Sequence, residues 1–267
     1  MKFLITGANG TLGKPFTELV EKSGHTAIKW DRTKAPIDNY QGMANYIKEI
    51  APDIIVSMAI ASKPTGIENE QWKVNCLWPS EIAKITKELG IKFLYTSTVM
   101  VFSFRKSGPF TIESKPDTIE GEGYGYEKRM AEENVIKNNP DACIVRLGWQ
   151  IGDKPGSNNM VDYCVDKMKN EKIIRASSNY FPACSFIENT LSKLFSLSAD
   201  FQAGIFMIDS NKKWSLNKII KALKKHLGIN WKIGNDPFFK YDQRMIDPQV
   251  EMPPLSDKLK DIDSFFL

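Results

Sequence analysis

Residues 1–14, MKFLITGANGTLGK, decide the fold. A short apolar run ends at Thr6, and Gly7, Gly10 and Gly13 follow at intervals of three. Glycine tolerates a positive φ and lets a phosphate or another backbone come close. The spacing therefore predicts a strand, a tight turn and a helix whose amino end offers free N–H groups. An ordinary strand-to-helix turn needs only one glycine, so the three together favour a dinucleotide site.

Each glycine has an expected task in this turn. Gly7 permits the turn, Gly10 lets a pyrophosphate approach the main chain, and Gly13 lets the helix pack closely on the sheet. We expect the cofactor to contact Gly7, Asn9, Gly10, Thr11, Leu12 and Gly13.

The rest of the chain alternates short apolar, β-branched runs with stretches of helical period, which is the pattern of a parallel sheet flanked by helices. The expected strands are 2–6, 25–30, 53–59, 91–97, 142–147 and 204–208. The expected helices are 11–23, 42–50, 69–89, 125–137, 159–170, 187–198 and 215–227. The fold class is thus α/β, a doubly wound parallel (Rossmann) sheet.

The second half of the chain is less regular. After about residue 150 we expect a loop in GDKPGSNN, a short strand at 172–176, a loop in SSNYFPACS and a largely irregular tail from Asn235. We therefore assign 1–150 to a dinucleotide-binding domain, with 200–212 returning to it. Residues 151–267 form a smaller, interleaved part that binds the substrate.

Composition excludes several classes of protein. The chain has 267 residues and a formal net charge of +4, without a basic block, which argues against a nucleic-acid partner. The four cysteines are far apart and the two histidines have no neighbours at ligand spacing, so we expect neither disulfides nor a metal site. No apolar stretch is long enough for a signal peptide or a membrane span, which predicts a cytoplasmic protein without a membrane partner.

The second expected strand ends in KWDRTK, at the distance where an acidic residue would bind an adenosine ribose. Asp31 suits the 2′-hydroxyl of NAD, whereas Arg32 and Lys34 suit the 2′-phosphate of NADP. The choice between NAD(H) and NADP(H) stays open here, and the two basic residues favour NADP(H). Asp38 follows as a helix N-cap or an adenine contact, and capping is the commoner role.

Tyr124 and Lys128 stand four residues apart in GYGYEKRMAEENV, which places them on one helix face. A lysine ammonium near a phenol favours the phenolate, so we expect Lys128 to hold the pKa of Tyr124 toward neutrality. Such pairs arise by chance, and Tyr163 with Lys167 is a second one. Only the first pair follows a strand that ends in a hydroxyl, at Thr98, and ligands bind beyond the carboxyl ends of such strands.

These stretches together resemble the extended short-chain dehydrogenase/reductases, which act on nucleotide-activated sugars. The resemblance rests on TGANGTLG, the strand end at Thr98 and YGYEK. More narrowly, PDIIVSMAIAS, VN at 74–75, STVMVF, RLGW, GSNNM and Pro182 are similar to the dTDP-4-dehydrorhamnose reductase family. The resemblance covers most of the chain and is weak over the last sixty residues or so.

The resemblance implies roles for particular residues. Thr98, Tyr124 and Lys128 would be the catalytic residues. Ala59 and Ile60 would lie beside the cofactor. The expected substrate contacts are Met100, Trp149 and Asn159.

The activity implied is reduction of a 4-keto nucleotide-activated deoxysugar by NADPH or NADH. Ser57, Met58, Val99 and Met100 depart from the family pattern, so the substrate pocket differs from that of the rhamnose enzymes. Two alternatives stay open, namely an epimerase or dehydratase with bound NAD, and a regulatory subunit that binds the cofactor without turnover. The partner is a nucleotide sugar, and a homodimer also stays open.

Overall fold

The computed structural model describes residues 1–62, 64–155 and 158–265. The chain folds into two compact units. The first consists of Met1–Ser103, Pro116–Arg146 and Leu191–Phe206, and the second of Phe104–Lys115, Leu147–Thr190 and Met207–Leu267. No helix within the described residues has the length and apolar character needed to cross a membrane.

A six-stranded sheet is the centre of the first unit, with the strand order β11-β6-β4-β3-β1-β2. Its strands are β1 (Lys2–Thr6), β2 (Thr26–Lys29), β3 (Ile54–Ser57), β4 (Lys92–Thr98), β6 (Cys143–Leu147) and β11 (Gly204–Ile208). β1 pairs in parallel with both β2 and β3, and β3 pairs in parallel with β4. The strand order reverses at β1, so the loop after β1 opens at the position where such sheets bind ligands. The expected α/β class and parallel sheet are confirmed.

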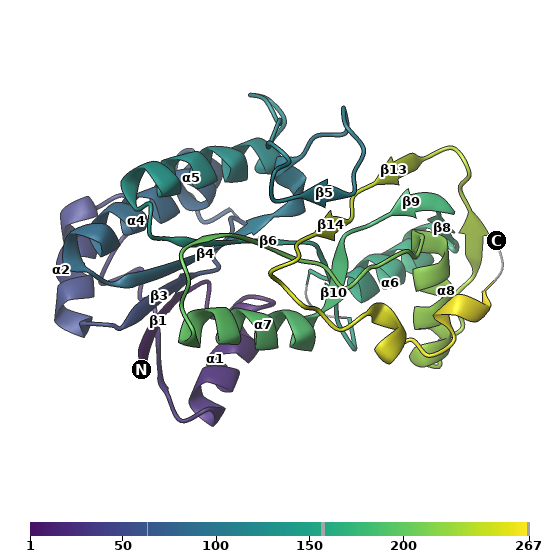
Figure 1. The fold of residues 1–267 in the computed structure, drawn as a ribbon, viewed down its shortest axis with the longest axis horizontal. Helices are drawn as coiled ribbons and strands as arrows, with labels where there is room; N and C mark the ends of the chain where they lie inside the picture. The colour runs from purple at the N-terminus through teal and green to yellow at the C-terminus, as the bar shows by residue number, and fades with distance from the viewer. Residues whose placement is uncertain (63, 156–157, 266–267) are drawn as a thin grey trace. The chain divides into compact units, whose positions relative to one another are not determined.

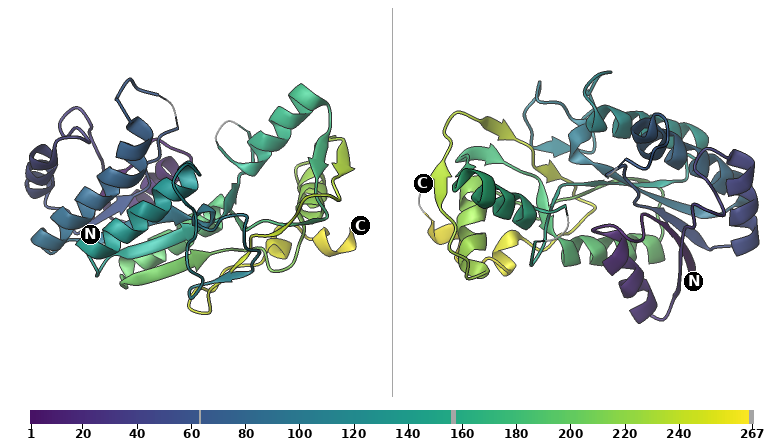
Figure 2. Two further views of the ribbon diagram at one scale, coloured as in Figure 1. Left: turned by 90° about the horizontal axis from the view of Figure 1, so that it is seen from above. Right: turned by 180° about the vertical axis from the view of Figure 1, so that it is seen from behind.

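Helices cover both faces of this sheet (Figure 1). One face carries α2 (Tyr40–Ile50), α4 (Trp78–Leu89) and α5 (Tyr124–Asn138), whose buried side chains share an apolar cluster with Leu4 and Ile55 of the sheet. The other face carries α1 (Gly13–Lys22) and the part of α7 (Ile187–Ala199) that belongs to this unit, as the view from behind also shows (Figure 2). The ring of Phe3 lies between these two helices, 6.4 Å from the ring of Phe16 and 6.3 Å from that of Phe195.

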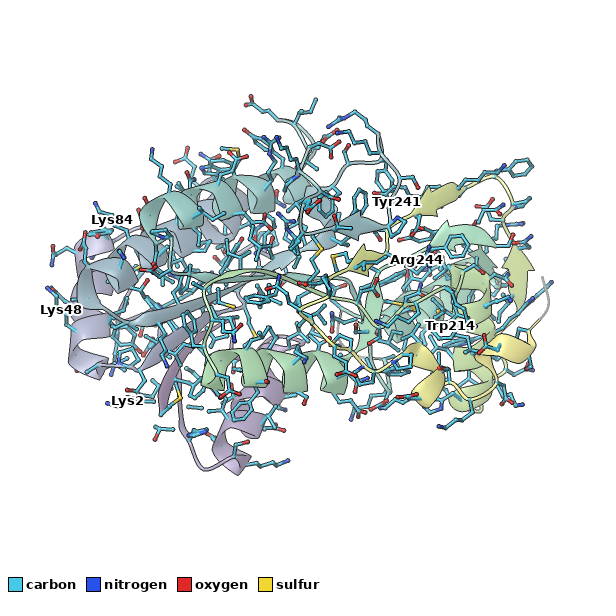
Figure 3. All side chains as sticks on the ribbon, in the orientation of Figure 1. Lys2, Lys48, Lys84, Trp214, Tyr241 and Arg244 are labelled. Atoms are coloured by element: carbon cyan, nitrogen blue, oxygen red, sulfur yellow. The ribbon has the colours of Figure 1, made fainter. Side chains whose placement is uncertain are left out.

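The second unit is built from short strands paired two by two. The parallel pairs are β7 (Trp149–Ile151) with β10 (Cys184–Phe186), β8 (Ile174–Ala176) with β12 (Ile233–Asn235), β9 (Asn179–Phe181) with β13 (Lys240–Asp242), and β5 (Phe110–Thr111) with β14 (Met245–Ile246). Helices α6 (Met160–Glu171) and α8 (Leu216–His226) enclose its apolar core. Tyr241 and Arg244, labelled in Figure 3, belong to β13 and the segment after it, and Arg244 Nη2 donates to Asp242 Oδ2 at 2.6 Å.

Two sequence expectations were wrong, and the tail that was expected to be largely irregular also contains short elements. The single helix expected over 69–89 is α3 (Glu70–Trp72), a π-helix η1 (Lys73–Leu77) and then α4. The stretch SSNYFPACS contains β9 and the start of β10 rather than only a loop, and the tail after Asn235 contains β13, β14 and the 3-10 helices η3 (Leu255–Asp257) and η4 (Ile262–Ser264). These strands are two or three residues long, which is too short for an alternating pattern to show. Within the expected loop GDKPGSNN, residues 156 and 157 lie outside the described residues.

Candidate active site

Each of the three glycines Gly7, Gly10 and Gly13 has a different environment in the turn after β1 and at the start of α1. Gly7 has φ of +68°, and a Cβ on it would lie 2.7 Å from Ala59 N. A Cβ on Gly13 would lie 2.0 Å from Gly7 O, so the helix packs closer to the turn than any side chain allows. A Cβ on Gly10 would approach only Gly7 O, at 3.2 Å, among the described residues. The backbone at Gly10 is thus accessible, which fits a cradle for a phosphate.

The helix after the turn begins at Gly13, two residues later than expected. Leu12 stands at its N-cap position without a side-chain cap, and Lys14 N donates to Gly10 O at 3.1 Å. Because Lys14 N is paired in this way and Pro15 has no N–H, the start of α1 leaves the N–H of Gly13 for a ligand or water, at the positive end of the helix dipole. Asn9 Oδ1 accepts from Lys29 Nζ at 3.3 Å, and Thr11 is half-buried.

The segment after β3 is fixed against this turn by the hydroxyl of Thr6. Thr6 Oγ1 accepts from the N–H groups of Met58 and Ala59 at 3.2 and 3.3 Å, and it donates to Ser57 Oγ at 3.2 Å. Ala59 thereby adjoins the glycine turn, while the side chain of Ile60 remains 41% exposed. Contact between these two residues and a cofactor stays a prediction.

The side chains at the end of β2 are held by the protein itself. Asp31 Oδ1 accepts from Thr33 Oγ1 at 2.7 Å and from Thr33 N at 2.9 Å, and these bonds lower the pKa of Asp31. The guanidinium of Arg32 lies 5.1 Å from the Trp78 ring centroid, with Nη1 3.8 Å from Glu70 Oε1. An acidic and a basic group both stand at the end of β2, where the sequence predicts the ribose, so the choice between NAD and NADP stays open.

Asp38 does not cap the helix that follows it, and that expectation was wrong. The cap is Asn39, whose Oδ1 accepts from Gly42 N at 2.9 Å, and α2 begins at Tyr40. Asp38 instead lies with Oδ2 3.7 Å from Lys73 Nζ. Asp and Asn are both good N-caps, so adjacent Asp and Asn residues do not reveal which of them takes the position. The alternative role of Asp38, an adenine contact, stays a prediction.

The helix with Tyr124 begins against the residues that follow Thr98. Thr98 ends β4, is 9% exposed, and accepts through Oγ1 from Met100 N at 3.2 Å. Tyr124 is the first residue of α5, and a Cβ on Gly125 would lie 2.3 Å from Met100 O. Only glycine allows this approach. The segments that carry the two hydroxyl groups are therefore in contact at the carboxyl end of β4.

Lys128, one helical turn after Tyr124, is buried on the sheet. Its exposure is 1%, its Nζ donates to Thr96 O at 2.7 Å, and the same atom lies 4.1 Å from the Tyr95 ring centroid. Burial lowers the pKa of Lys128 to about 7, although nearby Glu132 opposes this effect. Near neutral pH this amine exists in both charged and neutral forms.

The expected lowering of the Tyr124 pKa is not found. Burial first, and then the charge of Glu127, raise the pKa of Tyr124 above its usual value. Lys128 Nζ lies 6.0 Å from the Tyr124 ring centroid and is directed to Thr96 O, so it stabilises the phenolate little. The phenol of Tyr124 is therefore protonated at neutral pH, which is the form that can donate a proton.

Two residues that sequence reasoning did not assign to the site link its parts. Asn75 is 2% exposed; its Oδ1 accepts from Ala61 N at 3.0 Å and its Nδ2 donates to Glu127 Oε2 at 2.8 Å. A second link runs from Lys128 through Thr96, whose Oγ1 donates to Ser57 O at 3.0 Å. The only sequence signal was the VN at 74–75, since these partners come from distant parts of the chain.

The expected substrate residues have mixed environments. Met100 follows Thr98 and is 46% exposed. In the second unit, Trp149 is half-buried with its ring centroid 5.2 Å from that of Tyr163, and Asn159 caps α6 by accepting from Val161 N at 2.8 Å. Substrate contact by these three residues stays a prediction.

The chain also matches a known protein family. The profile of the RmlD substrate binding domain matches residues 1–180. The chain belongs to this family. It is thereby an NAD(P)-dependent oxidoreductase of the extended short-chain dehydrogenase/reductase type, and the resemblance drawn from the sequence is confirmed.

Curated relatives are distant. The spore coat polysaccharide biosynthesis protein SpsK of Bacillus subtilis is 22% identical over 233 residues, covering 85% of this chain and 80% of SpsK. A dTDP-4-dehydrorhamnose reductase of Burkholderia thailandensis is 29% identical over 152 residues, covering 56% of this chain and 50% of that enzyme. The chain thus spans most of SpsK but only about half of the Burkholderia reductase.

Solved structures share the fold across nearly the whole chain. A dTDP-4-dehydrorhamnose reductase of Bacillus anthracis in complex with NADP has a TM-score of 0.81 at 20% identity, with 99% of both chains covered. The Bordetella bronchiseptica enzyme WbmH in complex with NAD+ has a TM-score of 0.77 at 15% identity, with 97% of this chain and 95% of WbmH covered. At these identities the likeness extends to the fold alone.

Proposed function

We propose that this protein reduces the 4-keto group of a nucleotide-activated deoxysugar with NADPH or NADH. The observation that carries the proposal is the packing of the first turn of α5 on the end of β4. The segments with Thr98, Tyr124 and Lys128 thereby lie at the carboxyl ends of the parallel strands, as the glycine turn after β1 does. Several curated relatives are dTDP-4-dehydrorhamnose reductases, which supports a keto sugar as the substrate.

The residues present fit a nicotinamide dinucleotide. The turn at Gly10 and the uncapped start of α1 suit its phosphates, and the segment at Ala59 borders the turn. When bound, the cofactor supplies the hydride.

The protein's own groups would then manage the proton and the developing charge. Tyr124, protonated at neutral pH, donates its phenolic proton to the keto oxygen as negative charge develops there. Thr98 hydrogen-bonds the same oxygen, and the ammonium of Lys128 binds the nicotinamide ribose.

The test is a screen for oxidation of NADPH and NADH with dTDP-, UDP- and GDP-linked 4-keto-6-deoxy sugars. We expect turnover with at least one sugar, and we expect Tyr124→Phe to lower kcat by about a thousandfold because no other donor replaces the phenol. Binding of NADPH, measured by fluorescence, should be unchanged in that variant.

Two results would contradict the proposal. Normal turnover by Tyr124→Phe would show that Tyr124 is not the proton donor. Purified protein that carries tightly bound NAD and consumes no added NADPH would instead indicate an epimerase or dehydratase. The same screen decides between the two cofactors, because Asp31 and Arg32 suit different ribose substituents.

A further inference from the structure

A buried amide joins the helix with Tyr124 to the segment after β3. Asn75 lies in the π-helix η1, where one turn is wider than in an α-helix, and such bulges recur at functional sites. Its Oδ1 accepts from Ala61 N at 3.0 Å and its Nδ2 donates to Glu127 Oε2 at 2.8 Å. The amide has one donor end and one acceptor end, so only one of its two orientations satisfies both contacts.

Glu127 occupies a particular place in this arrangement. It stands between Tyr124 and Lys128 in the first two turns of α5. The residue four positions later on the helix is Ala131, so no i,i+4 ion pair forms there. A carboxylate that accepts from a buried amide forms a stronger bond than a neutral pair does. The contact therefore holds the beginning of α5 at a fixed place relative to Ala61.

We propose that Glu127 is a positioning residue for the reduction: through the Asn75 amide, its carboxylate holds Tyr124 and Lys128 in register with the segment that follows β3. This inference rests on the proposed function. It assigns Glu127 no contact with the substrate or the cofactor, and its effect is carried by the geometry of the two neighbouring side chains. Misplacement by an ångström is enough to lower a rate severely.

Reversing the polarity of the contact tests the proposal. Asn75→Asp places a carboxylate against Glu127 where an amide donated, so the two segments repel each other. Glu127→Gln alone keeps an acceptor for the Asn75 amide and removes only the charge. The double variant restores one donor and one acceptor in the opposite order, because Gln at 127 donates to Asp at 75 while Ala61 N still has an acceptor.

We expect Asn75→Asp to lower kcat/KM about 10- to 100-fold, which is the range of a lost charge-assisted bond. The double variant should recover most of this loss, and Glu127→Gln should stay within a few-fold of the parent protein. Glu133→Gln is the matched control, because it makes the same change on α5 at an exposed carboxylate that pairs with Arg129. It should leave kcat/KM unchanged.

A double variant no better than Asn75→Asp, or an Asn75→Asp protein with normal kcat/KM, would overturn the proposal. If Asn75→Asp does not fold, Glu127→Ala tests the same contact by removing the half-buried carboxylate. We expect this variant to lose about tenfold in kcat/KM, with little change in the thermal midpoint of unfolding. A normal rate in that variant would also overturn it. Failure of the parent protein to turn over any keto sugar would instead reject the proposed function itself.

The pH profile gives a readout that a purely structural role would not move. Glu127 is one of the groups that raise the pKa of Lys128, so Glu127→Gln should shift the fall in rate above neutrality to lower pH. An unshifted profile would contradict the assigned proximity. The groups facing Lys128 are Glu127 and Glu132 on its own helix, Cys76 on η1, Tyr95 on β4 and Tyr124.

Discussion

Two cations are buried beside α5, and their surroundings differ. Arg146 on β6 is 2% exposed and forms a two-point ion pair with Glu132. Its Nη2 donates to Oε2 at 2.7 Å and its Nε donates to Oε1 at 3.0 Å. Lys128 is equally buried, but its Nζ donates to a neutral carbonyl, Thr96 O. The paired cation joins helix to sheet through its ion pair, whereas Lys128 has a pKa lowered to about 7 by burial and can exchange a proton.

The comparison teaches that burial alone does not mark a functional charge. What distinguishes Lys128 is burial without a carboxylate held in a two-point bond, one turn after the phenol that begins α5. The distinction gives opposite expectations for the stability of the two positions.

The largest expected effect on stability is at Arg146. Arg146→Met leaves the carboxylate of Glu132 buried without its partner, so we expect the free energy of unfolding to fall by about 3–5 kcal/mol in urea titrations. Adding Glu132→Leu should recover most of the loss, because both charges are then gone. Lys87→Met breaks an exposed pair with Asp141 and serves as the control, with a change below about 1 kcal/mol. A similar loss of unfolding free energy in Arg146→Met and Lys87→Met would contradict the distinction between the buried and the exposed ion pair.

The opposite effect is expected at Lys128. A cation whose pKa is lowered by folding is disfavoured below the folded value, and the penalty is relieved as pH rises from about 7 to 10.5. Lys128→Met should therefore stabilise the protein at pH 6 by about 1–3 kcal/mol, with a smaller gain at pH 9, while turnover is lost. Lys137→Met, at the exposed end of α5, is the control. Destabilisation at pH 6 would show that Lys128 holds the fold as Arg146 does.

Much of the first unit could be predicted from sequence because its signals are local. The strands of the six-stranded sheet are apolar runs bounded by polar turns, and the glycines of the turn after β1 stand within seven residues of one another. The second unit lacks such signals. β9 pairs with β13, which lies 61 residues later in the chain, and both strands have only three residues.

The charges of the site were not predictable for the same reason. Tyr124 and Lys128 lie one helical turn apart on α5, and their spacing in the sequence predicted this. Their pKa values are shifted first by burial, and part of what buries Lys128 is the ring of Tyr95 and the carbonyl of Thr96, about thirty residues earlier on β4. A sequence pattern shows which groups can ionise, but it does not show how deeply they are buried.

The central claim is that Lys128 is a titrating cation whose charge is needed for the reduction in which Tyr124 donates the proton. Its most direct test is the pH dependence of kcat/KM for the keto sugar in the parent protein and in Lys128→Arg, which stays charged throughout the range. We expect the parent value to fall about tenfold per pH unit above roughly 7, as the cation is lost, and the variant to show no such fall. A parent profile that stays flat to pH 9, or the same fall in Lys128→Arg, would contradict the account.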